Sequence, residues 1–197
     1  MLNLDTEIKI YGLAPGSIVD GPGIRFGVFM QGCSHHCKAC HNPESQNHNA
    51  GSFKTVGEII EEFEKHKSCE GVTLSGGEPF DQSAAVCVLA KEFKKRNVNI
   101  WCYTGYLFED LLVMANSDES KNASKYCNKE FADSINGLLC NIDVLVDGEF
   151  VLEKKSYDAL YCGSTNQRLI DVPKSLHQNK LVLWSQDFVL PQKPSSW

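Results

Sequence analysis

Short strand-like stretches alternate with amphipathic helical stretches along most of this chain. Runs rich in β-branched and aromatic residues predict strands at 24–30, 71–74, 98–103 and 142–146. Apolar residues at helical spacing predict helices at 55–66, 83–95, 107–114 and 131–139. Because such alternation builds a parallel sheet with right-handed crossovers, we expect an α/β fold.

Other segments carry weaker patterns. Residues 116–129 are polar without periodicity, which predicts a surface loop. Residues 181–184 are expected to form a last strand or a sheet edge, and the tail at 191–197 is expected to be mobile. Thr55, followed three residues later by Glu58, predicts a capped start for the first helix.

A motif with chemical potential follows each predicted strand. A cysteine cluster follows the first strand and Ser-Gly-Gly-Glu follows the second. Thr104 and Gly105 follow the third strand, and Asp147 and Gly148 follow the fourth. Since ligands of parallel sheets bind beyond the carboxyl ends of the strands, one ligand site can touch all four segments.

Length and charge narrow the class of protein. The chain has 197 residues, so we expect a single domain over 1–197 that is shorter than the roughly 250 residues of an eight-stranded α/β barrel. The net charge of −6 argues against broad affinity for nucleic acid. No apolar run is long enough for a transmembrane helix, and the first residues lack a secretory pattern, so we expect no membrane partner and a cytoplasmic location.

Three of the nine cysteines are clustered as Cys33-x3-Cys37-x2-Cys40. Three thiolates on one loop can converge on one metal centre, because zinc and iron–sulfur clusters both take sulfur ligands. The other six are expected to be buried small apolar residues: Cys69, Cys87, Cys102, Cys127, Cys140 and Cys162.

Spacing alone leaves three kinds of metal centre open. A Cys3His zinc site is possible because His35, His36 and His41 are near. An electron-transfer cluster with four cysteine ligands is possible if one scattered cysteine joins the loop. The third kind is a cluster with three protein ligands, whose remaining iron stays open to a substrate.

The Ser-Gly-Gly-Glu-Pro stretch at 75–79 can be interpreted as a ligand-binding turn or as an ordinary turn. Gly76 and Gly77 let backbone approach a ligand closely, and Glu78 can accept hydrogen bonds from an ammonium group. The same residues also fit an ordinary Gly-Gly turn with a solvated carboxylate.

The cysteine spacing resembles that of radical S-adenosylmethionine (SAM) enzymes, and 75–79 resembles their methionine-binding motif. Residues 20–25, 31–33 and 40–43 are similar to the activating enzymes of glycyl-radical proteins. Later stretches are similar to the sub-family that activates anaerobic ribonucleotide reductase: 101–106, 143–150 and 162–168. The resemblance spans 18–171, the motif-bearing core, and leaves 172–197 as a C-terminal extension of unknown role.

The resemblance implies a shortened radical SAM fold, which is a partial (β/α)6-type open barrel with parallel strands. It implies that Cys33, Cys37 and Cys40 are the catalytic ligands of a 4Fe–4S cluster whose open iron binds SAM. Reductive cleavage of SAM would give a 5′-deoxyadenosyl radical, which takes a hydrogen from a glycine of the anaerobic ribonucleoside-triphosphate reductase. The chain would then be an oxidoreductase served by a flavodoxin or ferredoxin-type reductant.

The resemblance also implies contacts to SAM, which we expect from the following residues: Ala39, Cys40, His41, Gly76, Gly77, Glu78, Tyr103, Thr104 and Asp147. Ala39 departs from the pattern, since most radical SAM enzymes carry an aromatic residue there. We expect Arg25 to be a member of a structural ion pair. Asn166 and Arg168 are expected to face the partner or the SAM carboxylate, or to have a local structural role. His35 and His36 are expected to be solvated.

Three rival functions remain open at this point. The chain can be an activase of another glycyl-radical enzyme of the formate-lyase type, because its cysteine loop would look almost the same. It can also be an electron carrier with four cysteine ligands, or a zinc-binding interaction module.

Overall fold

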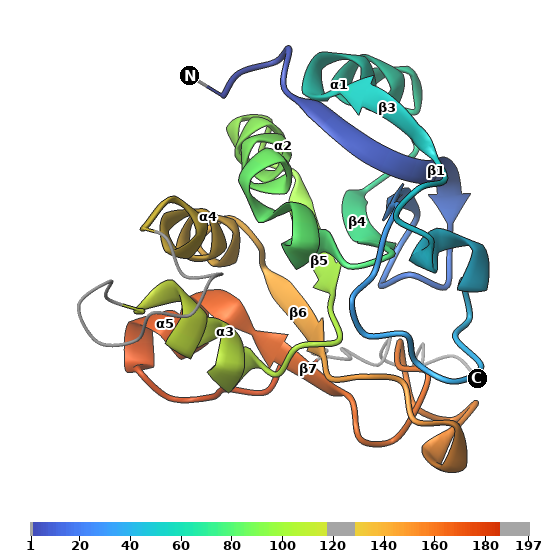
Figure 1. The fold of residues 1–197 in the computed structure, drawn as a ribbon, viewed down its shortest axis with the longest axis vertical. Helices are drawn as coiled ribbons and strands as arrows, with labels where there is room; N and C mark the ends of the chain where they lie inside the picture. Colours follow the sequence, from blue (N-terminus) through green and yellow to red (C-terminus); the bar gives the residue numbers. More distant parts are fainter. Residues whose placement is uncertain (1, 118–128, 186–197) are drawn as a thin grey trace, which may run out of the picture.

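The computed structural model describes residues 2–117 and 129–185. In this part of the chain, the strands form one sheet in the order β3-β1-β2-β4-β5-β6-β7 (Figure 1). The strands are β1 (Glu7–Ser17), β2 (Arg25–Met30), β3 (Ser52–Thr55), β4 (Gly71–Gly76), β5 (Asn99–Tyr103), β6 (Val144–Asp147) and β7 (Arg168–Asp171). The α-helices are α1 (Val56–Lys65), α2 (Ser83–Lys95), α3 (Phe108–Ala115), α4 (Lys129–Leu139) and α5 (Val172–Gln178).

The middle of the sheet is parallel. Strands β2, β4, β5 and β6 pair in parallel in that order. The flanks are antiparallel, because β1 pairs with β2, β3 with β1 and β7 with β6 in the opposite sense. The expected α/β fold with a shortened, open sheet is therefore confirmed, with four strands in its parallel part.

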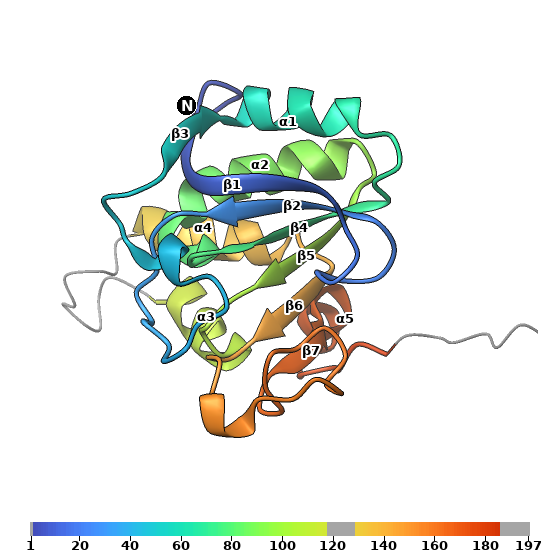
Figure 2. The same ribbon diagram turned by 90° about the vertical axis from the view of Figure 1, so that its right-hand side faces the viewer.

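Helices α1, α2 and α4 line one face of the sheet (Figure 1). The parallel strands all point to the side where the loop 31–51 lies (Figure 2). The carboxyl ends of β2, β4, β5 and β6 therefore meet beside that loop, as ligand sites of parallel sheets require.

The predicted helices are confirmed to within about two residues at each end, as pattern-based boundaries allow. The start of α1 is fixed by a capping box, in which Thr55 Oγ1 accepts from Glu58 N (3.1 Å) and Glu58 Oε2 accepts from Thr55 N (2.7 Å). Of the predicted loop 116–129, residues 118–128 lie outside the described residues, as does the predicted tail 191–197. Residue Leu183 forms an isolated bridge with Ile170, so 181–184 is a sheet edge.

The sheet buries apolar side chains on both faces. On β5, Ile100 and Cys102 join the main core under the helices, whereas Trp101 packs in a second cluster on the opposite face. Arg25 lies over the Trp101 ring at 5.8 Å and is 2% exposed. Its Nε donates to Thr73 Oγ1 (3.1 Å), and burial lowers its pKa to about 10. The expected structural role of Arg25 is confirmed, but among the described residues it rests on hydrogen bonds and the Trp101 ring and not on an ion pair.

No helix in the described ranges is both long and apolar enough to cross a membrane.

Candidate active site

The cysteine loop starts where β2 ends and is held at its root by backbone contacts. Gly32 N donates to Ser45 O (2.7 Å), and Cys33 N donates to Gln46 O (3.2 Å). The buried Gln31 side chain donates to two further carbonyl oxygens of the returning chain, at 2.9 and 2.8 Å. The loop therefore leaves the sheet from a fixed base.

Backbone N–H groups act on each of the three loop sulfurs. Asn42 N donates to Cys40 Sγ (3.4 Å). The N–H groups of His35 and His36 favour the thiolate of Cys33, and the N–H of Phe150 favours that of Cys37. Burial raises the pKa of the Cys33 thiol to about 11, and the two N–H groups oppose that shift. Hydrogen bonds to sulfur of this kind stabilise thiolates and tune iron–sulfur clusters, so the donor set fits such a group.

The three sulfurs of the described loop do not lie close enough together to bind one metal ion. Within residues 2–117 and 129–185, no three Cys, His, Asp or Glu side chains lie close enough together to hold one metal ion. His36 and Ala39, both in the left-handed region with φ of 52° and 58°, bend the loop between the cysteines. Ala39 is exposed on this bend.

The Gly-Gly turn after β4 packs directly against the root of the cysteine loop. Gly77 N donates to Met30 O and Glu78 N donates to Gly32 O, both at 2.8 Å. A Cβ atom on Gly77 would lie 2.0 Å from Gly32 O, and one on Gly76 would lie 2.5 Å from Met30 N. The structure therefore requires glycine at both positions for contact within the chain, whatever ligand they meet.

Glu78 is 1% exposed, and its carboxylate meets three hydrogen-bond donors and one imidazole ring. Oε1 accepts from Phe80 N and Thr104 Oγ1, both at 2.9 Å. Oε2 accepts from Gly105 N at 2.9 Å and contacts His35 Nε2 at 3.0 Å. The predicted residues Gly76, Gly77, Glu78 and Thr104 are thus brought together beside the cysteine loop.

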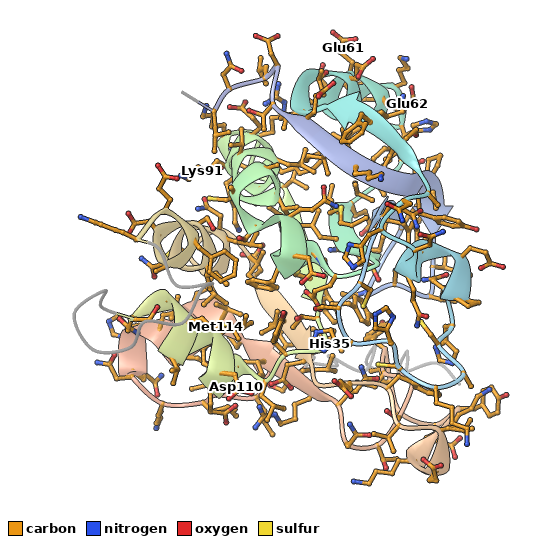
Figure 3. The ribbon with its side chains drawn as sticks, viewed as in Figure 1. His35, Glu61, Glu62, Lys91, Asp110 and Met114 are labelled. Carbon is orange, nitrogen blue, oxygen red and sulfur yellow. The ribbon has the colours of Figure 1, made fainter. Side chains whose placement is uncertain are left out.

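His35 lies between two carboxylates, so the expectation that it is solvated is wrong. Nδ1 lies 3.1 Å from Glu149 Oε1, and the ring meets Tyr106 edge-on at 4.4 Å. Burial disfavours the charged ring, yet Glu78 and Glu149 outweigh it and raise the pKa of His35. His36 is exposed, as expected. His35, Asp110 and Met114, labelled in Figure 3, line a cleft of about 650 Å³.

Asp147 is fully buried and belongs to an ion-pair network. Arg168 donates to both of its oxygens (Nε to Oδ1 3.0 Å, a terminal nitrogen to Oδ2 2.5 Å), and Phe108 N donates to Oδ2 (2.9 Å). The other side of the Arg168 fork binds both oxygens of Glu109 (3.0 and 2.6 Å). Arg168 therefore has a structural role, and Asn166 likewise donates to a backbone oxygen, that of Glu149 (2.9 Å).

His41 and Tyr103 line a second cleft of about 560 Å³, together with Asp20 and Cys162. The Tyr103 hydroxyl donates to Tyr161 O (2.9 Å), and burial raises the Tyr103 pKa. The His41 ring packs on Phe150 with centroids 4.6 Å apart. Two groups of predicted residues therefore flank the cysteine loop, one at Glu78 and one at this cleft.

The scattered cysteines only partly follow the expectation of burial. Cys87 and Cys102 are buried, Cys69 and Cys162 are half-buried, and Cys140 is exposed. Cys127 lies outside the described residues.

The site also contains residues that the sequence did not single out. Glu149 and Phe150 reach the cysteine loop from the end of β6, and Tyr106 reaches it from the end of β5. Glu149 and Phe150 belong to the motif at 143–150, so their place in that motif was the available signal.

The chain resembles known proteins over most of its length. Residues 19–170 match the family described as "4Fe-4S single cluster domain". The anaerobic ribonucleoside-triphosphate reductase-activating protein of Vibrio cholerae is 32% identical over 161 residues, which is 78% of this chain and 91% of the relative. The protein of the same name from Haemophilus influenzae is 31% identical with the same coverage.

Two further likenesses are shorter. The pyruvate formate-lyase-activating enzyme of Listeria monocytogenes is 42% identical over 84 residues, which is 39% of this chain and 34% of the relative. The crystal structure of QueE from Escherichia coli overlaps half of the chain with a TM-score of 0.45 and 12% identity. The long matches identify this chain as a member of the 4Fe-4S single cluster domain family and of its anaerobic ribonucleoside-triphosphate reductase-activating proteins.

Proposed function

We propose that this protein activates an anaerobic ribonucleotide reductase by generating a glycyl radical on it, with SAM and a 4Fe–4S cluster as cofactors. One observation carries the proposal: the three-cysteine loop is hydrogen-bonded, backbone to backbone, to the Gly-Gly-Glu turn at the end of the next parallel strand. The names of the family and of its long relatives support the same cluster and the same partner.

We assign Cys33, Cys37 and Cys40 as the three protein ligands of the cluster. The backbone N–H groups aimed at their sulfurs support this assignment. When bound, the cluster supplies one electron to SAM, and the overall reaction converts SAM and a partner glycine into methionine, 5′-deoxyadenosine and a glycyl radical. The chain supplies position and shielding for that reaction.

We assign the methionine part of SAM to Gly76, Gly77, Glu78 and Thr104. The Glu78 carboxylate already accepts three hydrogen bonds and contacts the His35 ring, so an incoming ammonium group has to replace one of the donors. Of these donors, the Thr104 hydroxyl rotates about a single side-chain bond, whereas two others are backbone N–H groups. Thr104 would then yield its place on Oε1 to the ligand.

We place the adenosine part in the cleft lined by His41 and Tyr103, beside the backbone of Ala39 and Cys40. His41 and Tyr103 both line this cleft with aromatic rings. The exposed Ala39 has only a methyl side chain, so it leaves room for a ligand at the bend of the loop. Asp147 receives a different role, because Arg168 engages both of its oxygens. We assign it to support of the strand end, not to SAM.

The partner is a protein loop that carries the glycine, so the open sheet suits it better than a closed barrel would. We expect a flavodoxin or ferredoxin-type protein to deliver the electron, because the family requires an external reductant. We propose no nucleic-acid or membrane partner.

Anaerobic reconstitution with iron and sulfide tests the proposal. The reduced protein should change its electron paramagnetic resonance spectrum when SAM is added, and it should release 5′-deoxyadenosine with a glycyl radical on the reductase. A spectrum that stays the same when SAM is added would favour an electron carrier. A colourless protein that contains zinc would exclude the cluster.

Cysteine variants test the ligand set. Cys37→Ala should abolish 5′-deoxyadenosine formation, because the cluster loses one of three ligands. Cys162→Ala is the matched variant for iron content, since this half-buried cysteine lines the cleft that also contains His41. Loss of iron from Cys162→Ala would mean four protein ligands and would overturn the open-iron assignment.

A second candidate function is activation of a formate-lyase type partner, which the 42% identity over 84 residues favours. Incubation of the reconstituted protein with each partner in turn decides between them. The partner on which the glycyl radical spectrum develops is the substrate.

A further inference from the structure

His35 reaches from the cysteine loop to the ends of three parallel strands. Its ring contacts Glu78 beyond β4 (3.0 Å), Tyr106 beyond β5 (4.4 Å between centroids) and Glu149 beyond β6 (3.1 Å). These partners lie up to 114 residues away along the chain. The ring therefore joins the loop to the part of the sheet where the site is built.

The surroundings are shaped to hold this ring. Gly105 passes so close that a Cβ atom there would lie 2.5 Å from His35 Cδ2. Only 10% of the His35 side chain is exposed. The contact with Glu78 is an ion-pair contact in which the ring N–H is not aligned for a hydrogen bond, whereas the ring nitrogen facing Glu149 is hydrogen-bonded.

Ser34, the residue before His35, also binds the segment that follows β4. Ser34 donates from its N–H and its hydroxyl to the two oxygens of Asp81, at 2.9 and 3.0 Å. Residues 34 and 35 lie between Cys33 and Cys37 on the same loop. A shift of His35 would therefore move the backbone between two of the cysteines and a contact on Glu78 together.

We propose that His35 is a positioning residue: its imidazole ties the cysteine loop to Glu78 and Glu149 and thereby fixes the cluster ligands relative to the methionine-binding turn. The inference rests on the proposed function for the identity of the cluster and of SAM. In this proposal His35 acts through Glu78 and the loop and is assigned no contact with either cofactor.

The test compares His35→Ala with His36→Asn in the full chain, reconstituted and cluster-free. His36 is the matched control because it is exposed and is the neighbour of His35 on the same loop. Asn tolerates its left-handed backbone. Three quantities are measured: hydrogen–deuterium exchange of residues 33–42, the dissociation constant of SAM, and the change of the reduced spectrum on SAM addition.

His35→Ala should weaken SAM binding about 10–100-fold, the range seen when an orienting partner of a metal site is removed. It should also speed exchange in the loop and alter the SAM-dependent spectrum. His35→Gln should recover part of the loss, because its amide can donate to one carboxylate. His36→Asn should match the wild type. If His35→Ala binds SAM as tightly as His36→Asn, with unchanged loop exchange, the inference is wrong.

A second variant covers the case in which His35→Ala unfolds. Glu149→Ala removes the partner on the other side of the ring and should weaken SAM binding in the same direction. The double variant should be no worse than His35→Ala alone, because Glu149 acts through the ring. Additive losses would overturn the inference. A wild-type protein that forms no SAM-responsive cluster would overturn the proposed function instead, while the exchange experiment would still decide whether His35 holds the loop.

Discussion

Glu78 and Asp147 are two buried carboxylates at the carboxyl ends of parallel strands, and the family resemblance implied a contact with SAM for both. Their partners differ. Asp147 faces Arg168, which is also bound bidentately to Glu109. Glu78 faces two backbone N–H groups, one hydroxyl and one imidazole.

This difference separates a structural carboxylate from one that can serve a ligand. The guanidinium of Arg168 keeps its charge at any working pH and fills both oxygens of Asp147, so a ligand would have to break a buried ion pair. The donors on Glu78 include a hydroxyl that can turn away. Position at a strand end is therefore not sufficient for ligand binding. Whether a buried carboxylate can bind a ligand depends on which groups already donate hydrogen bonds to it.

The largest effect should come from Gly77→Ala, beside Glu78. The new Cβ atom would meet the Gly32 carbonyl oxygen at 2.0 Å, and backbone cannot move aside as a side chain can. We expect a loss of about 3 kcal/mol or more in the free energy of unfolding, at or above the upper end for overpacking. Urea unfolding of the cluster-free chain measures it. Gly12→Ala is the control, since its Cβ would have nothing within 4 Å. Equal stability of the two variants would contradict the close packing.

Asp147→Ala should come next and should act on stability, not on SAM binding. It leaves Arg168 with Glu109 alone and removes the acceptor for Phe108 N at the start of α3. We expect about 2–3 kcal/mol, below the full cost of breaking a buried pair because Arg168 is 31% exposed and keeps one partner. SAM affinity of the folded, reconstituted variant should stay at the wild-type value. A selective loss of SAM affinity would place Asp147 in the ligand site after all.

The fold was predictable where its signal is local. The helices follow apolar spacing and caps, and α2 coincides with its predicted bounds at 83–95. Strand β1 was not predicted, because Gly12, Pro15 and Gly16 interrupt it and such residues are depleted in strands. It forms because β2 pairs along it despite two register shifts. Partners far away in sequence thus override local propensity.

The site divides in the same way. The cysteine spacing and the Gly-Gly-Glu turn are local motifs, so the sequence was sufficient to predict them. Thr104, which contacts Glu78 in the structure, was predicted as well. The need for Gly77 was assigned to a ligand, whereas the structure gives it a partner in Gly32. The contact between His35 and Glu149 joins residues 114 positions apart, so no local sequence pattern could predict it.

Glu78→Gln should reverse the outcome expected for Asp147→Ala. The amide keeps one acceptor oxygen but turns an NH2 group toward donors, so we expect about 1–2 kcal/mol lower stability. The free energy of SAM binding should fall by more than the free energy of unfolding, because the variant lacks the charge that we propose receives the ammonium group. Calorimetric titration of SAM and urea unfolding on the same preparation compare the two. Unchanged SAM affinity would remove Glu78 from the ligand site and erase the contrast with Asp147.

The smallest effect should come from Glu109→Gln, at the exposed end of the Asp147 network. The hydrogen bonds from Arg168 lower the pKa of Glu109 in the folded chain. A carboxylate with a lowered folded pKa adds stability above its unfolded pKa and loses it as the pH falls through the folded value. Because Glu109 is 54% exposed, we expect at most about 1 kcal/mol at pH 7. Urea midpoints from pH 7 down to pH 3 should therefore converge for wild type and Glu109→Gln at the acid end. A constant gap at every pH would mean that the Glu109 carboxylate contributes through packing and not through its charge on Arg168.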